Sequence, residues 1–245
     1  MLNSKFLYFA LNQFLSNSFH KQITKLVKNE KKLVIFDVGC YRGIFTKSML
    51  DLIGNKKYKI YLFDINKKVK KYISYLLRLK NIYYNEVALS NKNGKANYNY
   101  NKFFEAAGSS LSSLVKNETT WNFTRKLVLL SRKGFVTYKV HTITLDSFVK
   151  KSKIKSIDIL KIDIEGSEYE LLKGAKNTLN KNKIKIILVE ILAKKNFYIK
   201  KEKKVLNLLK KRNFALLKKV NIPSISLFSN IRGGDYLLVN KKYIK

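Results

Sequence analysis

Acidic side chains gather in one short stretch of this 245-residue chain. Five of its 16 acids lie between positions 158 and 170, although 51 Lys and Arg residues give the chain a formal net charge of +35. Asp163 and Glu165 lie two positions apart at the carboxyl end of an apolar run, so in an extended strand their side chains share one direction. Lys161 lies on the same side, and a buried ammonium needs a carboxylate partner. The sequence therefore predicts interacting charges at the end of a strand.

These carboxylates suit general base chemistry, in which a side chain takes the proton of a reacting hydroxyl. Asp163, Glu165 and His141 are the three candidates for this catalytic role, and the sequence does not rank them. His141 lies in a strand-like run, where a structural histidine is the commoner outcome. Asp163, Glu165 and Glu190 are also candidate ligands of a divalent cation. No third ligand follows at a fixed spacing, so no metal site is predicted.

A glycine pattern follows the first β-rich run. Asp37, Gly39 and Gly43 form the series D-x-G-x-x-x-G, which leads from that run into helical spacing. Glycine allows a tight turn there and lets a ligand lie against the backbone, facing the N–H groups at the helix start. The spacing lacks the second glycine of the dinucleotide fingerprint that would face a pyrophosphate. It therefore favours an adenosyl cofactor without phosphates, S-adenosylmethionine, whose amino group and sulfonium the Asp37 carboxylate suits.

A second acid, Asp64, ends the next β-rich run. An acid at that place in a doubly wound sheet can accept both hydroxyls of a ribose. The alternative is that Asp64 caps the helix predicted to start near Asn66. We expect Asp64 to bind the cofactor.

The elements that must position these residues alternate between β-rich runs and helical spacing, which is typical of a doubly wound, mostly parallel α/β sheet. Helical spacing that starts at 167 places Glu168 and Glu170 in the first turns, where the helix dipole alone accounts for them. The predicted strands are 33–38, 58–64, 81–89, 157–163, 184–192, 214–220 and 236–239, and the predicted helices are 43–53, 67–80, 167–179 and 200–212.

Two segments interrupt this alternation. Residues 1–30 have helical spacing and form a predicted extension that packs on the domain of residues 31–245, or else lies on a membrane surface. Residues 91–135 contain Asn93-Gly94, which predicts a hairpin turn, and a serine-rich stretch; we expect this segment to be a substrate lid over the sheet edge. No segment is long and apolar enough to span a bilayer, which predicts a cytoplasmic protein.

Several segments together resemble the FkbM family of S-adenosylmethionine-dependent methyltransferases. The strongest match is IDILKIDIEGSEYELLKGA at 157–175. The resemblance covers about 33–191 and implies a Rossmann-like, seven-stranded class I methyltransferase fold. The chain departs from the family at Cys40-Tyr41-Arg42, where small residues and Asn are usual, and at Asp64-Ile65, where Glu-Pro is common. Further segments in the family's order are VIFDVGCYRGIFT (34–46), YLFDIN (61–66), EVALSNKNGKANY (86–98), SSL (109–111), TLDSF (144–148) and ILVEI (187–191).

The resemblance implies roles for residues at these positions. Asp64 would hold the ribose, Glu86–Ser90 would lie near the adenine, and Asp163 and Glu165 would border the site of methyl transfer. Such enzymes typically methylate hydroxyls of sugars, glycolipids or polyketide-like metabolites. The expected cofactor-binding residues are Asp37, Gly39, Cys40, Gly43, Asp64, Ile65, Ala88, Leu89 and Asp163.

The excess of Lys leaves other functions open. A basic chain is typical of nucleic-acid binders, so an RNA methyltransferase is the main alternative, and a non-catalytic binding protein with the same fold is another. However, 45 of the 51 cations are Lys, whereas Arg is the usual choice for bidentate phosphate contacts. No separate RNA-binding module is visible either. The sequence therefore favours O-methylation of a sugar, glycan or related hydroxyl, with the Lys excess as genomic drift or as attraction for an anionic acceptor.

Overall fold

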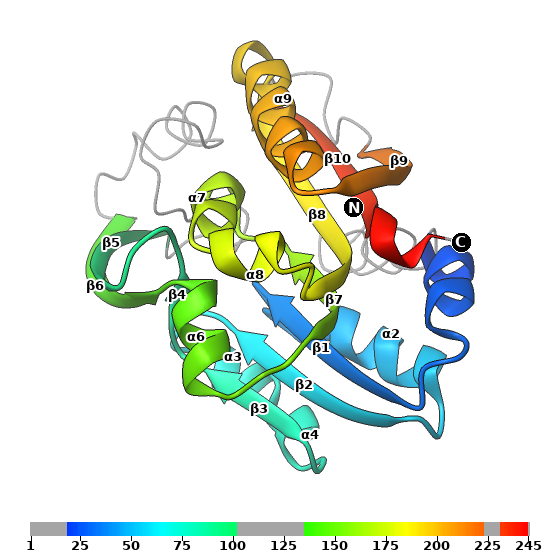
Figure 1. The fold of residues 1–245 in the computed structure, drawn as a ribbon. Coiled ribbons are helices and arrows are strands. Elements are labelled where there is room, and N and C mark those ends of the chain that lie inside the picture. The colour runs from blue at the N-terminus through cyan, green and yellow to red at the C-terminus, as the bar shows by residue number, and fades with distance from the viewer. Residues whose placement is uncertain (1–18, 102–134, 223–230, 245) are drawn as a thin grey trace, which may run out of the picture.

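The β-rich runs form one seven-stranded sheet with the order β3-β2-β1-β7-β8-β10-β9 (Figure 1). The computed structural model describes residues 19–101, 135–222 and 231–244. The first five strands of this order are parallel, and β10 runs antiparallel to both β8 and β9. This arrangement confirms the predicted doubly wound, mostly parallel sheet. The strands are β1 (Lys32–Val38), β2 (Lys57–Phe63), β3 (Ile82–Asn85), β7 (Ile157–Ile162), β8 (Ile184–Lys194), β9 (Phe214–Ile222) and β10 (Ile231–Asn240).

Helices cover both faces of the sheet because its strands are apolar on both sides. A helix described over 19–27, α2, α3 and α4 pack on one face, and α6, α7, α8 and α9 pack on the other. Side chains alternate between the faces along each strand: in β1, Ile35 belongs to the α2 side and Phe36 to the α9 side. The helices are α2 (Ile44–Ile53), α3 (Val69–Tyr72), α4 (Ser74–Leu77), α6 (Leu145–Lys151), α7 (Glu168–Lys173), α8 (Lys176–Asn180) and α9 (Lys195–Lys211), with a 3-10 helix, η2 (Lys241–Tyr243).

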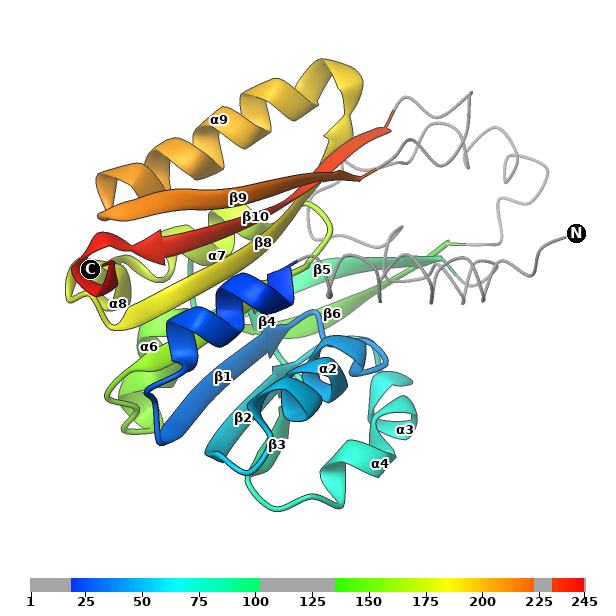
Figure 2. The ribbon, with the colours of Figure 1, turned by 90° about the vertical axis from the view of Figure 1, so that its right-hand side faces the viewer.

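A second, three-stranded sheet lies beyond the carboxyl ends of β1 and β2 (Figure 2). It consists of β4 (Ala88–Leu89), β5 (Gly94–Asn101) and β6 (Phe135–Ile143) in the order β4-β6-β5. The predicted single strand 81–89 is therefore wrong, because its two ends pair in different sheets.

The predicted hairpin turn at Asn93-Gly94 is also wrong. Gly94 is the first residue of β5 and pairs with Thr142 of β6, far along the chain. The side chain of Asn93 instead accepts a hydrogen bond from the backbone N–H of Thr144 at 2.8 Å and donates one to Ser147 at 3.0 Å. Both ends of the predicted lid 91–135 thus belong to the second sheet, and residues 102–134 lie outside the described part of the chain.

Two predicted helices each form as two short ones. The segment 67–80 divides at Ile73 into α3 and α4, and 167–179 divides at Gly174 into α7 and α8. At Gly174 the reason is a close approach: a Cβ there would lie 2.0 Å from the carbonyl oxygen of Ser90. The chain bends where the second sheet meets it.

The described end of the N-terminal segment is a helix over 19–27 that packs on the sheet. Phe19, Ile23 and Val27 are each 1% exposed and lie in the same core as α2. This supports the prediction that the segment packs on the domain, although the apolar residues between 6 and 15 lie outside the described residues. In the parts of the chain that are described, no helix is long and apolar enough to cross a membrane.

Candidate active site

A cleft opens at the carboxyl ends of β1, β2 and β7, against the second sheet. Backbone and side chains from both sheets line it, and part of it is open to solvent. A ligand bound there would lie where doubly wound sheets bind theirs. Six of the expected cofactor-binding residues line it: Gly39, Asp64, Ile65, Ala88, Leu89 and Asp163.

Gly39 fixes the turn at the bottom of this cleft. Its φ of +79° lies in the left-handed region, and a Cβ there would lie 1.7 Å from the carbonyl oxygen of Asp163. Gly43 has a φ of +70°, and its Cβ would lie 2.3 Å from the Leu76 side chain. At Gly39 the neighbouring backbone requires glycine, whereas at Gly43 the Leu76 methyl group can shift and the positive φ is what favours glycine. Only Gly39 lines the cleft, so the prediction of a cofactor contact at Gly43 is not supported.

Asp64 lies on the cleft wall and also organises the turn around it. One carboxylate oxygen accepts the backbone N–H of Tyr41 at 3.0 Å, and the other accepts that of Asn66 at 3.0 Å. Burial raises the pKa of Asp64 to about 6, although the backbone N–H groups of Asn66, Tyr41 and Ile65 oppose the rise. Asp64 does not cap α3, which follows Lys68 and has no side-chain cap. An ionised carboxylate has about four acceptor sites, so Asp64 can also receive ribose hydroxyls.

Asp37 and Cys40 are buried and do not line the cleft, so their predicted cofactor contacts stay a prediction. Asp37 is fully buried, accepts a hydrogen bond from the Thr46 hydroxyl at 2.7 Å, and pairs with the ammonium of Lys161 at 3.4 Å. Cys40 is 4% exposed and packs in the core under α2, where burial raises the pKa of its thiol well above its usual value. Both residues are buried next to residues that line the cleft, such as Gly39, and do not line it themselves.

A row of charged side chains crosses four neighbouring strands at the carboxyl edge of the sheet. Asp37 on β1 pairs in register with Lys161 on β7, and Glu190 on β8 pairs with Asp235 on β10. Because side chains alternate along a strand, each of the four lies on the α2 side, two positions from a core residue of that face. Those core residues are Ile35, Ile159, Leu188 and Leu237.

Lys161 is the cation of this row, as the sequence predicts. Its ammonium lies 3.0 Å from a carboxylate oxygen of Asp163, 3.4 Å from one of Asp37 and 3.4 Å from the carbonyl oxygen of Gly39. Burial alone would lower the pKa of Lys161, but the charges of Asp163 and Asp37 outweigh burial and hold the pKa above its usual value. Lys161 therefore stays charged and ties β1 to the loop after β7.

Asp163, Glu165 and Glu190 come together beside Lys161, with one carboxylate oxygen from each within 4.8 Å of the others. Burial favours the neutral form of all three groups. For Asp163, Lys161 and a hydrogen bond from Glu190 outweigh burial and lower the pKa. For Glu165 and Glu190, burial and the charge of Asp163 raise the pKa well above its usual value. Glu165 has a φ of +52°, so the loop carries backbone strain at this residue.

His141 is the candidate base that the structure does not bring to this group. It is exposed on β6, where it pairs in register with Lys95, and it is not among the residues that line the cleft. The alternation of β6 explains this placement, since its neighbour Thr142 is buried instead. We make no catalytic proposal for His141.

Glu168 has a different partner from the helix dipole that the sequence suggests. It is 1% exposed, accepts the backbone N–H of Gly166 at 2.7 Å and pairs with the ammonium of Lys201 on α9 at 2.8 Å. This buried ion pair joins the start of α7 to α9 on the same face of the sheet. The spacing of α9 gives no signal for it, because Lys201 is one of many lysines on that helix.

Three further residues of the site are not foreseen by the sequence. Tyr98 from β5 and Ser167 from the loop after β7 line the cleft, and the Ser167 hydroxyl has no hydrogen-bond partner in the described chain. Asp235 lies in β10 between apolar and glycine residues, and burial raises its pKa to about 7. The signal for Asp235 was an acid within an apolar strand, the same argument that identifies Lys161.

Comparison with known proteins agrees with this geometry. Residues 37–216 match the methyltransferase FkbM domain, which is well over half of the chain. The chain belongs to the FkbM methyltransferase family. Membership confirms the predicted family and, with it, S-adenosylmethionine as the cofactor.

Two known proteins show how far the similarity extends. The 2-O-methyltransferase NoeI of Sinorhizobium fredii (strain NBRC 101917 / NGR234) is 25% identical over 173 residues, which are 67% of this chain and 65% of that protein. The solved structure of the methyltransferase FkbM of Methylobacillus flagellatus KT has 11% identity and a TM-score of 0.52 and shares the fold; the match covers 84% of this chain and 44% of that one. The chain thus spans less than two thirds of either protein.

The FkbM domain match includes every candidate residue that the sequence predicts, from Asp37 to Glu190. Asp235 lies beyond residue 216, where the match ends. The row of charges therefore combines residues of the matched domain with one that the last strand of the sheet adds.

Proposed function

We propose that this chain transfers the methyl group of S-adenosylmethionine to a hydroxyl of a sugar, glycan or related metabolite. The observation that carries the proposal is that Asp163 and Glu165 belong both to the cleft wall and to the acidic group beside it. The carboxylates of Asp163 and Glu165 can receive a proton, and they lie beside the cleft in which the cofactor would bind.

The residues present fit the cofactor. The cleft lies at the carboxyl ends of the parallel strands and is partly open to solvent, and the Asp64 carboxylate lies on its wall. Ala88 and Leu89 from β4 offer an apolar surface suited to an adenine, opposite the turn at Gly39. When bound, S-adenosylmethionine supplies an electrophilic methyl group. We assign Asp64 to the ribose and β4 to the adenine.

The chain's own residues would then orient the acceptor and take its proton. Holding the attacking oxygen in line with the methyl carbon accounts for much of the rate in such displacements. The Asp163 and Glu165 carboxylates are the groups at the cleft that can accept the hydroxyl proton. Lys161 keeps Asp163 in place through their 3.0 Å contact. In this proposal Asp163 and Glu165 are catalytic residues, whereas Asp37 and Lys161 are positioning residues.

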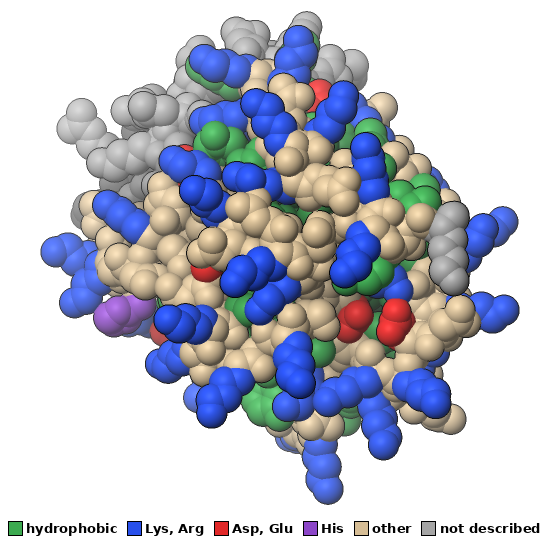
Figure 3. All heavy atoms as spheres, viewed as in Figure 1, with side chains coloured by type: hydrophobic (Ala, Val, Ile, Leu, Met, Phe, Trp, Pro, Cys, Tyr) green, Lys and Arg blue, Asp and Glu red, His purple; other side chains and the backbone are tan. Residues whose placement is uncertain are grey.

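The acceptor class rests on two further points. The relative NoeI is a 2-O-methyltransferase, which supports an oxygen acceptor. The net charge of +35 favours an anionic acceptor, such as an acidic glycan. Lys and Arg side chains are spread over the visible face in Figure 3 and do not form one patch on a single element. On this face, general attraction therefore fits better than a shaped nucleic-acid groove.

The test is to incubate the full chain with S-adenosylmethionine labelled in its methyl group and with separated glycan, lipid and RNA fractions. We expect label in a glycan or glycolipid fraction, and a loss of turnover of roughly a hundredfold or more in Asp163→Asn with little change in cofactor affinity. Asp158→Asn is the matched control, because Asp158 lies at the other end of the same strand. Label in RNA alone would replace this proposal with an RNA methyltransferase, and cofactor binding without any transfer would indicate a binding protein.

Salt provides a second test of the acceptor. If the Lys excess attracts an anionic acceptor, kcat/KM falls steeply as ionic strength rises, because screening shortens the reach of the surface charges. A kcat/KM that does not change with salt would remove the charge from the function and leave the transfer reaction itself in place.

A further inference from the structure

The acidic group beside the cleft contains more carboxylates than its cation can pair. Lys161 is shared between Asp163 and the fully buried Asp37. Glu165 and Glu190 nevertheless bring their carboxylate oxygens within 4.8 Å of that of Asp163. The sheet thus supplies the third carboxylate that no fixed spacing in the sequence could reveal, because β8 lies next to β7.

A second observation points to the same place. Asp235 is 8% exposed, and its Oδ2 accepts no hydrogen bond within the described residues. Asp235 pairs in register with Glu190 across β8 and β10, so the two side chains stand on the same face of the sheet. It also interacts electrostatically with Asp163 and Lys161. A buried acceptor without a donor is costly, and this one lies near acids that share the single ammonium of Lys161.

We propose that Asp163, Glu165 and Glu190 bind a divalent cation that prefers oxygen ligands, with Asp235 accepting a hydrogen bond from a water on that ion. The donor set is entirely carboxylate, which suits Mg²⁺, Mn²⁺ or Ca²⁺ rather than Zn²⁺. Opposite ligands lie about 4.2 Å apart around Mg²⁺ and about 4.8 Å apart around Ca²⁺, given their usual metal–oxygen distances. The 4.8 Å limit on the three oxygens is therefore compatible with one ion between them.

An ion at this position would lie beside the cleft and could act on the acceptor hydroxyl. Asp163 and Glu165 also line the cleft, so an ion on them would border the space where the acceptor hydroxyl must lie. It would hold that oxygen and favour loss of its proton. This use rests on the methyl transfer proposed above, whereas cation binding by the three carboxylates does not.

The experiment measures Mn²⁺ binding to the full chain by electron paramagnetic resonance, without cofactor or acceptor. We expect one Mn²⁺ per chain, displaced by Mg²⁺, and an affinity at least about tenfold lower in Glu190→Gln. Glu30→Gln is the matched control, because Glu30 lies at the opposite edge of the sheet and is paired with Lys185. Asp235→Asn, which leaves the three ligands intact, is expected to lower the affinity by a smaller factor and serves if Glu190→Gln does not fold.

The proposal is overturned if the wild-type chain binds no Mn²⁺ up to about millimolar concentration, the weak end of protein cation sites. It is also overturned if folded Glu190→Gln and Asp235→Asn bind Mn²⁺ as the wild type does. Since binding is measured without cofactor and acceptor, failure of the chain to transfer a methyl group leaves a positive result standing. Conversely, labelled product formed in the presence of a chelator, together with no Mn²⁺ binding, would retain the transferase and remove the ion.

Discussion

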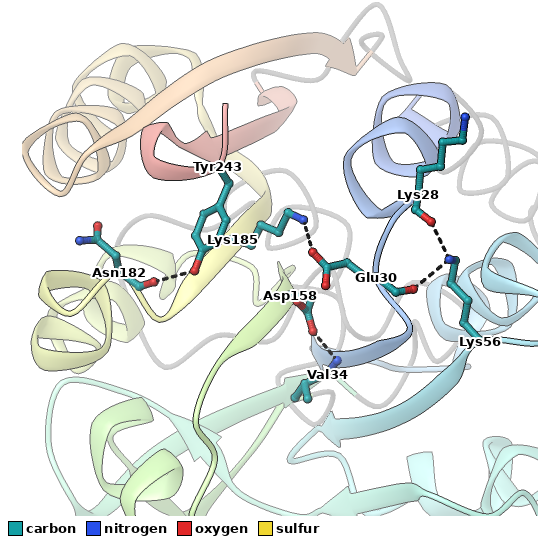
Figure 4. Close-up of polar contacts among 8 residues, drawn as sticks. All are labelled: Lys28, Glu30, Val34, Lys56, Asp158, Asn182, Lys185 and Tyr243. Atoms are coloured by element: carbon teal, nitrogen blue, oxygen red, sulfur yellow. Dashed lines mark hydrogen bonds and ion pairs between the residues drawn. The ribbon is translucent and has the colours of Figure 1, made fainter. Parts of the chain in front are cut away.

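The two edges of the central sheet use the same residue types in opposite ways. At the amino edge, shown in Figure 4, Glu30 pairs with Lys185 at 2.6 Å, and Asp158 accepts the backbone N–H of Val34 at 2.7 Å. Lys56 donates to two backbone carbonyl oxygens, at 2.8 and 2.9 Å. Each of these charged groups has a partner, and these contacts join the helix over 19–27 and the loop after α2 to the strands.

At the carboxyl edge, acids outnumber their partners. Lys161 serves both Asp37 and Asp163, while an oxygen of Asp235 has no hydrogen-bond donor among the described residues. An acid at a strand end is therefore not informative by its type alone. What distinguishes the site is that its charges are incompletely paired next to a cleft, whereas each of these groups at the amino edge has an ion-pair or hydrogen-bond partner.

Glycine substitutions give the largest expected difference between the edges. Gly39→Ala places a Cβ 1.7 Å from the Asp163 carbonyl oxygen at a φ of +79°. The backbone at position 39 or at Asp163 must move to relieve this contact, so we expect a loss of about 4 kcal/mol or more in the free energy of unfolding. Gly54→Ala lies in the turn before β2, with a φ of +54° and nothing within 4 Å of the added Cβ. Only backbone strain acts there, with an expected cost of about 1–3 kcal/mol.

Urea denaturation of the two variants measures both values. Equal losses would mean that the turn at Gly39 has room to relax, and the close contact of the β1 and β7 loops would then not define the bottom of the cleft.

Removal of the central cation tests the pairing itself. Lys161→Met leaves Asp37 buried without its counter-ion, for which we expect a loss of about 3–5 kcal/mol in the free energy of unfolding. Lys185→Met at the amino edge leaves Glu30, whose side chain is 37% exposed and can be solvated. Its expected loss is about 1 kcal/mol or less. A larger loss at Lys185 than at Lys161, again from urea denaturation, would reverse the comparison of the two edges.

The sequence predicts the sheet well because each apolar run had to be covered on both faces. The alternation of side chains along a strand also determines which face of the sheet each charged residue occupies. Asp37 lies two positions after Ile35 and so stands on the α2 face, where it accepts a hydrogen bond from the Thr46 hydroxyl. Gly39 and Gly43 both have a positive φ, as the predicted tight turn needs, but the Asp163 backbone that requires glycine at position 39 is far away in the sequence.

Strand order accounts for most of what sequence reasoning missed. Glu190 and Asp235 meet because β10 inserts between β8 and β9, and no local pattern specifies that insertion. Likewise, the split of 81–89 follows from pairing of Ala88 with Thr142 in another sheet. Local chemistry therefore identified which residues carry charge at strand ends, and the topology decided which of them meet.

Cofactor affinity is expected to depend on one edge only. Asp64→Ala removes the carboxylate assigned to the ribose, so we expect S-adenosylhomocysteine to bind roughly ten- to a hundredfold more weakly by calorimetry. Asp158→Ala also removes a carboxylate that accepts a backbone N–H, but at the amino edge, and is expected to leave the affinity unchanged. Unchanged affinity in Asp64→Ala would contradict the assignment of the ribose to this wall of the cleft.

The pH dependence of the same binding gives the smallest expected effect. Burial raises the pKa of Asp64 to about 6, and the ionised form is the better acceptor for ribose hydroxyls. Affinity for S-adenosylhomocysteine should therefore fall about tenfold from about pH 7.5 to about pH 5, as Asp64 takes up its proton. Stability changes in the opposite direction: the folded chain holds a proton that the unfolded chain releases, so this residue's contribution to stability is lost as pH rises from about 4 through about 6.

Asp64→Asn isolates this contribution, because the other carboxylates of the site also titrate in the variant. We expect a flatter affinity profile between about pH 5 and about pH 7.5 in Asp64→Asn than in the wild type, since the group that changes charge at about 6 is gone. Parallel profiles in the two proteins would assign the pH dependence to the acids around Lys161 instead. The cofactor would then depend on the row of charges across the sheet and not on the end of β2.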